Sequence, residues 1–266
     1  MSLDTFTCTE RRRTCVIIPT FNEADNIQAL IVEVLALPVA VGVIVVDDNS
    51  PDGTGDLAEE MVDAHPGRVH VVHRPGKLGL GTAYVAGFRL ALDGLGAGKV
   101  LTMDADFSHL PRYIPAMIAM SHEKHIVIGS RYVPGGGTAN WPLSRQLLSW
   151  GANTFTRFAL GLKAHDTTAG FRLYHREVLE TIRPESIRSS GYSFLVEMLF
   201  NCERRGFQVG QVPIIFEDRR QGTSKISKQE ITRAIQTVFR LIPQRFRRIP
   251  NLQPPTSNLQ PPISNL

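Results

Sequence analysis

Short apolar runs alternate with segments of helical periodicity along much of this 266-residue chain. Val41 to Val46 is a continuous apolar run, which is typical of strands buried on both faces of a sheet. Before it, apolar residues from Ile27 to Leu35 recur at the spacing of an amphipathic helix. Strands that alternate with such helices predict an α/β fold, with a mostly parallel sheet and helices on both faces. The length suits one substantial domain with an appendage.

The same pattern predicts where most elements lie. The predicted strands cover residues 16–18, 41–46, 69–72, 99–103, 125–128 and 209–216, with a further strand and turn around 167–170. The predicted helices cover about 27–35, a segment that ends near 64, and 79–92, 112–121, 143–160, 191–205 and 228–242. The last helix has an apolar face formed by Ile231, Ile235, Val238, Phe239 and Ile242. Pro243 is expected to end or kink this helix.

Two carboxylates, Asp104 and Asp106, come directly after the strand predicted at 99–103. Carboxylates one residue apart beyond a buried strand can turn into one crevice, and such oxygen-rich sites suit Mg²⁺ or Mn²⁺. Because Mg²⁺ often binds one or two carboxylates together with substrate phosphates, the implied ligand is a nucleoside diphosphate. An isolated Asp-X-Asp also occurs in solvated loops that bind nothing.

Further acids are expected on the same edge of the sheet. Ligands of parallel sheets bind outside the carboxyl ends of the strands, which places residues 19–23, 47–52 and 104–108 along one rim. Glu23 is a candidate for the ribose hydroxyls, and Asp47 or Asp48 for a base or ribose edge. Helix capping is an alternative explanation for Glu23. Turn chemistry is the alternative for the Asp-Asn-Ser-Pro-Asp-Gly stretch.

Composition argues against several classes of protein. The cysteines are odd in number and unpatterned, which argues against a disulfide framework or a zinc site and indicates a reducing compartment. The longest apolar run, residues 39–46, is too short to span a membrane. The residues after Arg11, Arg12 and Arg13 do not have the pattern of a signal peptide. We therefore expect a cytoplasmic location.

Basic residues gather near the C-terminus. Residues 225–248 contain seven Lys or Arg and a single acid, Glu230. Such a block attracts phosphate, whether of lipid, nucleotide or nucleic acid. Because no interleaved aromatic signature accompanies it, nucleic acid is not expected as a partner. The tail repeats Asn-Leu-Gln-Pro-Pro at residues 251–255 and 258–262, and we expect it to be disordered.

Six strings occur in a fixed order along the chain. They are Val-Ile-Ile-Pro-Thr-Phe-Asn-Glu, Val-Val-Asp-Asp-Asn-Ser-Pro-Asp-Gly-Thr, Gly-Lys-Leu-Gly-Leu-Gly-Thr-Ala, Met-Asp-Ala-Asp-Phe-Ser-His, Gly-Ser-Arg-Tyr and Gly-Thr-Ser-Lys. Over residues 14–243 this order resembles family 2 glycosyltransferases of the dolichol-phosphate mannose synthase type. The resemblance implies a GT-A fold and a Mg²⁺ or Mn²⁺ cofactor. It also implies inverting transfer of mannose from GDP-mannose to a polyprenyl monophosphate.

The resemblance implies site residues position by position. For the donor nucleoside these are Pro19, Thr20, Glu23, Val46 and Asp48, and for the diphosphate and metal they are Asp104, Ala105 and Asp106. Arg219 and Lys225 resemble a closing loop that grips donor phosphate. Arg131 and Arg145 resemble a clamp for the acceptor phosphate and complete the catalytic set with Asp106. The alternative for Arg145 is a solvated helix residue.

Two further residues carry expectations of their own. His109 fits the mannosyl branch of the family, and a capping or hydrogen-bonding role is as reasonable for it as metal ligation. Glu197 is a candidate for sugar contact, with a helix-surface acid as the alternative.

The resemblance also organises the chain. Together with composition and periodicity, it divides the chain into an expected flexible segment (1–13), a GT-A catalytic domain (14–226), a basic amphipathic helix (227–248) and a disordered Pro-rich tail (249–266). Some relatives carry C-terminal membrane-spanning helices, which this sequence lacks, so we expect the basic helix to hold the protein on the cytoplasmic face of a membrane. The alternatives are a UDP-sugar-dependent glucosyl or aminosugar transferase and a non-catalytic nucleotide-sugar or membrane-surface module. The sequence leaves any protein partner open.

Overall fold

The computed structural model describes residues 13–218 and 228–247. The predicted flexible segment up to residue 12, the predicted disordered tail and the two donor contacts Arg219 and Lys225 lie outside these ranges.

Most strands and helices follow one another in the order that the periodicity predicts. The elements of the first half are β1 (Thr14–Thr20), α1 (Ala24–Leu35), β2 (Val41–Asp47), α2 (Thr54–Ala64), β3 (Val69–His73), α3 (Leu80–Arg89), β4 (Lys99–Thr102), α4 (Ile114–Met120) and β5 (Ile126–Ser130). Those of the second half are β6 (Gly137–Thr138), α5 (Leu143–Leu160), β7 (Arg172–His175), α6 (Arg176–Ile182), α7 (Tyr192–Arg204), β8 (Val209–Pro213), β9 (Ile215–Phe216) and α8 (Lys228–Arg245).

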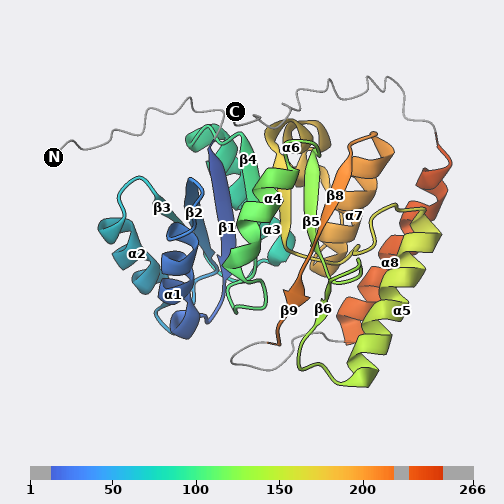
Figure 1. The fold of residues 1–266 in the computed structure, drawn as a ribbon, viewed down its shortest axis with the longest axis horizontal. Coiled ribbons are helices and arrows are strands. Elements are labelled where there is room, and N and C mark those ends of the chain that lie inside the picture. Colours follow the sequence, from blue (N-terminus) through green and yellow to red (C-terminus); the bar gives the residue numbers. More distant parts are fainter. Residues whose placement is uncertain (1–12, 219–227, 248–266) are drawn as a thin grey trace.

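Seven of these strands form one twisted sheet in the order β3-β2-β1-β4-β7-β5-β8 (Figure 1). Only β7 runs antiparallel, to both of its neighbours, β4 and β5. The short strands β6 and β9 form a separate parallel pair. The prediction of a mostly parallel sheet flanked by helices is therefore confirmed.

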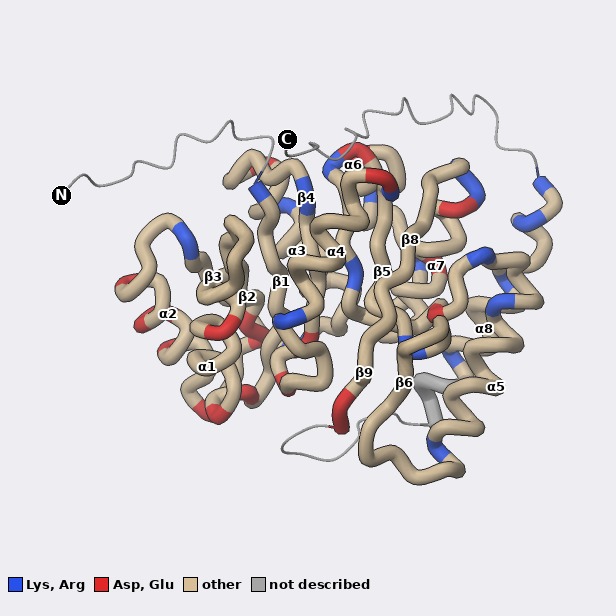
Figure 2. Tube along the Cα trace, in the orientation of Figure 1, with Lys and Arg blue, Asp and Glu red and all other residues tan. Residues whose placement is uncertain are grey.

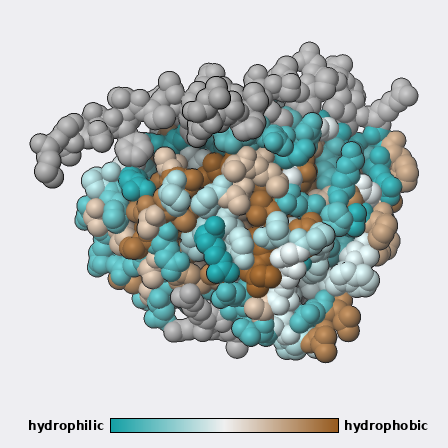
Figure 3. Space-filling view, viewed as in Figure 1, coloured by the Kyte–Doolittle hydropathy of each residue, from teal (hydrophilic) through white to brown (hydrophobic). Residues whose placement is uncertain are grey.

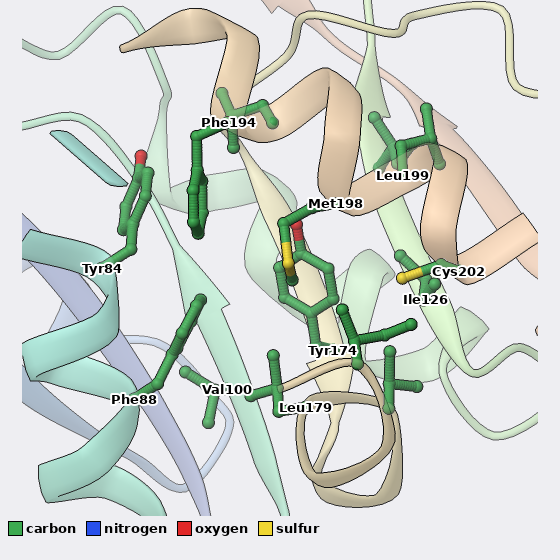
Figure 4. Close-up of a cluster of buried hydrophobic side chains, with 14 of the residues drawn as sticks. Tyr84, Phe88, Val100, Ile126, Tyr174, Leu179, Phe194, Met198, Leu199 and Cys202 are labelled. Atoms are coloured by element: carbon green, nitrogen blue, oxygen red, sulfur yellow. The ribbon is translucent and has the colours of Figure 1, made fainter. Parts of the chain in front are cut away.

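Each face of the sheet buries its own apolar cluster. Helices α1, α2 and α4 cover one face, and α3, α6 and α7 cover the other with parts of α5 and α8. Successive residues of β1 supply the two clusters in turn, because side chains of a strand alternate between its faces: Ile17 joins one and Val16 and Ile18 the other. Figure 4 shows α3 and α7 facing each other, with Tyr84 and Phe194 stacked at 6.4 Å between ring centroids.

Several elements differ from their predictions. The strand expected at 209–216 is divided into β8 and β9, and the periodicity does not predict β6 or α6. The strand expected around 167–170 begins later, at Arg172, and residues 164–171 form an irregular loop. Helix α8 continues past Pro243 to Arg245. Its expected single apolar face is divided, because Val238 is buried whereas Ile235 and Phe239 are exposed. Packing against α5 and α7 decides which side of α8 is buried. The periodicity of the sequence alone does not determine that side.

Helix α3 carries one wall of the cleft described below, and its close approach to β1 depends on Gly87. A methyl group at Gly87 would lie 2.6 Å from Cγ2 of Ile17, which is fully buried. We expect Gly87→Ala to lower the free energy of unfolding by about 1–3 kcal/mol, although Ala favours helix over Gly. Urea unfolding measures this loss.

Gly76→Ala is the matched control, because a methyl group there meets no atom within 4 Å. Ile17→Ala should lower the free energy of unfolding less in the Gly87→Ala background than in the wild type. Equal stability of Gly87→Ala and the wild type would contradict the packing argument.

Candidate active site

The carboxyl ends of β1, β2 and β4 open into a cleft of about 660 Å³. It is lined by Pro19, Thr20, Phe21, Glu23, Asp48, residues 77–80, Ala83, Asp104, Ala105, Asp106, residues 190–192 and Arg233. Of the residues predicted for the donor, the structure thus brings together seven, which lie at or just after the carboxyl ends of three strands. Among the predicted donor residues that the structure describes, Val46 is the exception, since it is fully buried in the core on the α3 side and does not line the cleft.

Asp48 is a buried acid that lines this cleft. Arg74 donates a hydrogen bond from Nη1 to Oδ1 of Asp48 at 2.6 Å, and its Nη2 donates to Thr82. Burial raises the pKa of Asp48, and the charge of Arg74 opposes that rise. Sequence reasoning missed Arg74. By binding one carboxylate oxygen of Asp48, Arg74 fixes the orientation of the whole carboxylate, including the second oxygen.

The neighbouring Asp47 has a structural role. Its carboxylate accepts hydrogen bonds from the hydroxyl of Thr20 and from both the backbone N–H and the hydroxyl of Ser50. Asp52 similarly accepts hydrogen bonds from the Ala24 and Thr54 amides at the starts of α1 and α2. Turn chemistry thus accounts for Asp47 and Asp52, and of the acids of this loop only Asp48 lines the cleft.

Glu23 combines the two roles that the sequence left open. It is the residue before α1, and its backbone carbonyl accepts hydrogen bonds from the amides of Asn26 and Ile27. Its carboxylate accepts a hydrogen bond from the side chain of Asn26 at 3.0 Å. The side chain also lines the cleft.

Asp104 and Asp106 lie at the junction of this cleft with a second one, and both residues line both. The Asp106 carboxylate is 4% exposed and accepts hydrogen bonds from the amide and the hydroxyl of Ser108. Two hard carboxylates suit Mg²⁺ or Mn²⁺. Within residues 13–218 and 228–247, no group of three or more His, Cys, Asp or Glu forms a complete protein site, so a cation here needs ligand oxygens as well.

His109 supports the backbone of the acidic pair. Its Nδ1 accepts a hydrogen bond from the Asp104 amide at 3.0 Å, which assigns the ring proton to Nε2. The ring is buried and stacks on Phe171 at 5.0 Å between centroids. Burial lowers the pKa of His109 despite the nearby carboxylates of Asp104 and Asp106, so the neutral ring acts as a fixed hydrogen-bond partner.

The second cleft is smaller, about 240 Å³, and mostly apolar apart from its charged end. It is lined by Asp104, Asp106, His109, Gly129, Arg131, Trp141, Arg145, Leu148, Ser149, Ala152, residues 168–170, Tyr192, Ile214, Phe216 and Ala234. The structure therefore brings Arg131 and Arg145 to the acidic pair from the end of β5 and from α5. A charged end beside an apolar channel suits a ligand with an anionic head and a hydrocarbon tail.

Arg131 is held by a buried acid that sequence reasoning missed. Asp166 is 0% exposed, and its carboxylate accepts hydrogen bonds from Nε and Nη2 of Arg131, both at 2.8 Å. Burial alone would raise the pKa of Asp166, but the charge and hydrogen bonds of Arg131 hold it below its usual range. Asp166 is a lone acid in a loop, and no spacing in the sequence pairs it with Arg131.

Arg145 is held more loosely. Its Nη1 donates to Asp218 at 3.0 Å, and its guanidinium lies 3.9 Å from the centre of the Trp141 ring. The side chains of Arg145 and Asp218 are 28% and 38% exposed, so this pair is screened by water.

Glu197, the candidate for sugar contact, lies in a different environment from the one expected. The residue is 6% exposed on α7 and lines neither cleft. Its Oε2 accepts hydrogen bonds from the Ser189 hydroxyl and from Arg240 of α8 at 2.6 Å. Neither a sugar ligand nor a solvated helix surface describes this position, because tertiary packing buries it between α7 and α8.

Comparison with known proteins identifies the family of this site. The family model described as glycosyl transferase family 2 matches residues 15–183, which include the acidic pair and Arg131. The chain belongs to glycosyltransferase family 2.

Curated relatives of this glycosyltransferase match over most of its length. It is 46% identical to the polyprenol monophosphomannose synthase of Mycolicibacterium smegmatis, over 87% of this chain and 88% of that one. It is 42% identical to the undecaprenyl-phosphate mannosyltransferase of Micrococcus luteus, over 86% of this chain and 93% of that one.

A solved structure with this fold is glucosyl-3-phosphoglycerate synthase from Mycobacterium tuberculosis. Its complex with Mn²⁺, UDP and glucosyl-3-phosphoglycerate matches with a TM-score of 0.61 over 88% of this chain and 80% of that one. The sequence identity is 18%, so this likeness shows the GT-A-like fold alone.

The buried pair in this glycosyltransferase yields a stability prediction. Asp166→Asn removes the countercharge of a buried guanidinium, so we expect the free energy of unfolding to fall by about 3–5 kcal/mol. Replacing both partners, as in Arg131→Met with Asp166→Leu, should cost less than this single change, because no uncompensated charge stays buried. Urea unfolding of both variants measures the difference.

Asp218→Asn is the control, since its partner Arg145 is partly exposed, and it should cost less than about 1 kcal/mol. A single Asp166→Asn variant as stable as Asp218→Asn would contradict the role given to Asp166.

Proposed function

We propose that this glycosyltransferase transfers mannose from GDP-mannose to a polyprenyl monophosphate, with inversion at the anomeric carbon. The observation that carries the proposal is the position of Asp104 and Asp106, which line both a polar cleft and an apolar cleft with two arginines. Donor and acceptor bound in these clefts would meet at the acidic pair. The similarity to a polyprenol monophosphomannose synthase over most of both chains supports the choice of sugar and acceptor.

The donor is assigned to the larger cleft. The Asp48 carboxylate, oriented by Arg74, accepts hydrogen bonds from the nucleoside, and Glu23 from the ribose hydroxyls. Asp104 and Asp106 would hold Mg²⁺ or Mn²⁺, which neutralises charge on the departing diphosphate when it is bound. Arg219 and Lys225, outside the described residues, are proposed to add positive charge to the same diphosphate.

The acceptor is assigned to the apolar cleft. A phosphate monoester has a second pKa of about 6, so it is already an anionic oxygen nucleophile near neutral pH and needs no general base. Arg131 stays charged. Burial lowers its pKa, but the charge and hydrogen bonds of Asp166 outweigh this effect and raise the pKa above its ordinary value. Arg131 and Arg145 thus orient the acceptor phosphate while Trp141, Leu148 and Phe216 contact the first part of its chain. Attack from the face opposite the leaving GDP inverts the anomeric carbon.

A long prenyl chain requires contact with a membrane, and α5 and α8 offer a suitable surface. Their exposed large apolar residues are Leu143, Leu147, Leu148, Trp150, Phe155, Phe158, Ile235 and Phe239, and Phe246 follows directly after α8. Figure 3 shows apolar side chains at the right-hand edge, where Figure 1 places these helices. Figure 2 shows acids around α1 and α2 and basic residues around α8. Among the described helices, none is long and apolar enough to cross a membrane.

We therefore propose that the α5–α8 surface rests on a membrane, on its cytoplasmic face. The apolar cleft is lined by Leu148 of α5 and Ala234 of α8, so the acceptor phosphate would reach the acidic pair from this side. Arg245, the last residue of α8, and Arg247, just beyond it, are exposed and add attraction to anionic lipid.

A transfer assay tests the proposed reaction. Protein, Mg²⁺ or Mn²⁺ and a polyprenyl phosphate are incubated with labelled GDP-mannose, UDP-glucose or a UDP-aminosugar, and organic-extractable label is counted. We expect label from GDP-mannose alone, and a loss of at least about 100-fold with Asp106→Asn, as is usual for a group that stabilises a transition state. Asp56→Asn, an exposed acid on α2, is the control. Transfer from a UDP-sugar only, or full activity of folded Asp106→Asn, would reject the proposal.

The membrane surface makes a separate prediction. The double substitution Leu147→Ser with Phe158→Ser removes two large exposed side chains, each worth roughly 1.5–3 kcal/mol when buried in lipid. Sedimentation with anionic vesicles should fall by more than tenfold, while turnover of a short soluble acceptor changes little.

Val32→Ser is the matched control, because Val32 is 52% exposed on α1, on the other side of the molecule. If both variants sediment like the wild type, the membrane contact lies elsewhere on the protein.

A further inference from the structure

A second polar cavity lies between α7 and α8, beside the donor cleft. Its volume is about 390 Å³. It is lined by Arg188, Ser189, Ser190, Ser193, Arg233, Gln236, Thr237 and Arg240. Only Ser190 and Arg233 also line the donor cleft, and neither Asp48 nor the acidic pair reaches this cavity. The proposed reaction therefore leaves this cavity without a role.

The charge in this cavity is positive. Three arginines line it, and Glu197, which pairs with Arg240 at 2.6 Å, does not line the cavity. Arg188 is exposed and has no hydrogen bond or ion pair with any residue that the structure describes. Arginine side chains that converge with hydroxyl groups match the oxygens of a phosphate group.

Ser193 provides an independent sign of a ligand. The residue is 1% exposed, and its Oγ has no hydrogen-bond partner among the described residues. A buried hydroxyl without a partner destabilises a folded protein, so its occurrence at a cavity wall indicates a group that binds there.

The backbone beside Ser193 reinforces this reading. Ser193 lies in the first turn of α7, a helix of 13 residues whose N-terminus has no side-chain cap. The positive end of the helix dipole at such a terminus favours an anion.

We propose that the cavity between α7 and α8 is a second anion site, which binds a phosphate group. Arg188 and Arg240 would contact the phosphate oxygens, and the Ser193 hydroxyl would donate to one of them. Two sources share this chemistry, the headgroup of an anionic phospholipid and free phosphate. The site does not depend on the proposed sugar or acceptor. A bound phosphate would connect α8 with residues 190–192, which form one wall of the donor cleft.

Titration with inorganic phosphate tests the site directly. In phosphate-free buffer without nucleotide, calorimetry compares the wild type with Arg188→Ala and Ser193→Ala. We expect each variant to bind phosphate about tenfold more weakly, the loss expected for one hydrogen bond to a charged group. Arg89→Ala, an exposed arginine on α3, removes the same charge elsewhere and should bind like the wild type. Thermal melts without phosphate should show Ser193→Ala at least as stable as the wild type.

Three results would overturn the proposal. First, Arg188→Ala and Ser193→Ala could bind phosphate as tightly as Arg89→Ala does, which would show that Arg188 and Ser193 do not contact it. A large loss of stability in Ser193→Ala without phosphate gives its hydroxyl a purely structural role. Complete displacement of phosphate by GDP with Mg²⁺ would show that the phosphate binds in the donor cleft. These measurements use neither mannose nor prenyl acceptor. The anion site can therefore be rejected while the transfer assay succeeds, and the transfer assay can fail while the anion site is confirmed.

Vesicles separate the two sources of phosphate. Sedimentation with phosphatidylglycerol vesicles, against phosphatidylcholine vesicles, compares Arg188→Ala with Arg89→Ala. A specific loss for Arg188→Ala assigns the site to a lipid headgroup. Equal sedimentation, together with weaker inorganic phosphate binding by Arg188→Ala, assigns it to free phosphate.

Discussion

The parallel pairing of β1 with β2 and β4 is the constraint on which the site depends. It aligns the carboxyl ends of three strands at one edge, where the loops that carry Glu23, Asp48 and the Asp104–Asp106 pair must leave the sheet. Apolar clusters on both faces fix this register, since a slip of one residue would exchange the side chains of β1 between the two cores. The acids therefore converge as a consequence of how the sheet is packed.

Buried charges at this edge are arranged in pairs that orient them. Arg74 holds one oxygen of Asp48, and Asp166 holds two nitrogens of Arg131. Each charge loses its hydration on burial, and a partner at hydrogen-bond distance offsets that cost. The pairing also leaves little freedom for the side chains, so the proposed donor and acceptor would meet groups that are already in place. The partly exposed Arg145 differs, because its contact with Asp218 is open to water.

The molecule presents different surfaces on its two sides. Acids gather around α1 and α2, whereas the outer side of α5 and α8 is apolar and its flanks are basic (Figures 2 and 3). An apolar surface of this extent is unusual on a protein that meets only water. It adjoins the cleft that holds Arg131 and Arg145, and the polar cavity with Ser193 lies between α7 and α8. The proposed lipid contacts and the catalytic edge are thus joined by the same helices.

The sequence by itself determined the alternation of strands and helices, the acids at the strand ends and the family, because these depend on local periodicity and on short strings of residues. Tertiary structure alone decided which buried partners those residues have. Asp166 with Arg131, Arg74 with Asp48 and Glu197 with Arg240 join positions that are 26 to 43 residues apart in the chain. It also decided that Val238 of α8 is buried while Phe239 is exposed. The reason is physical: such pairs form only when separate helices and loops pack together, and no local pattern records that packing.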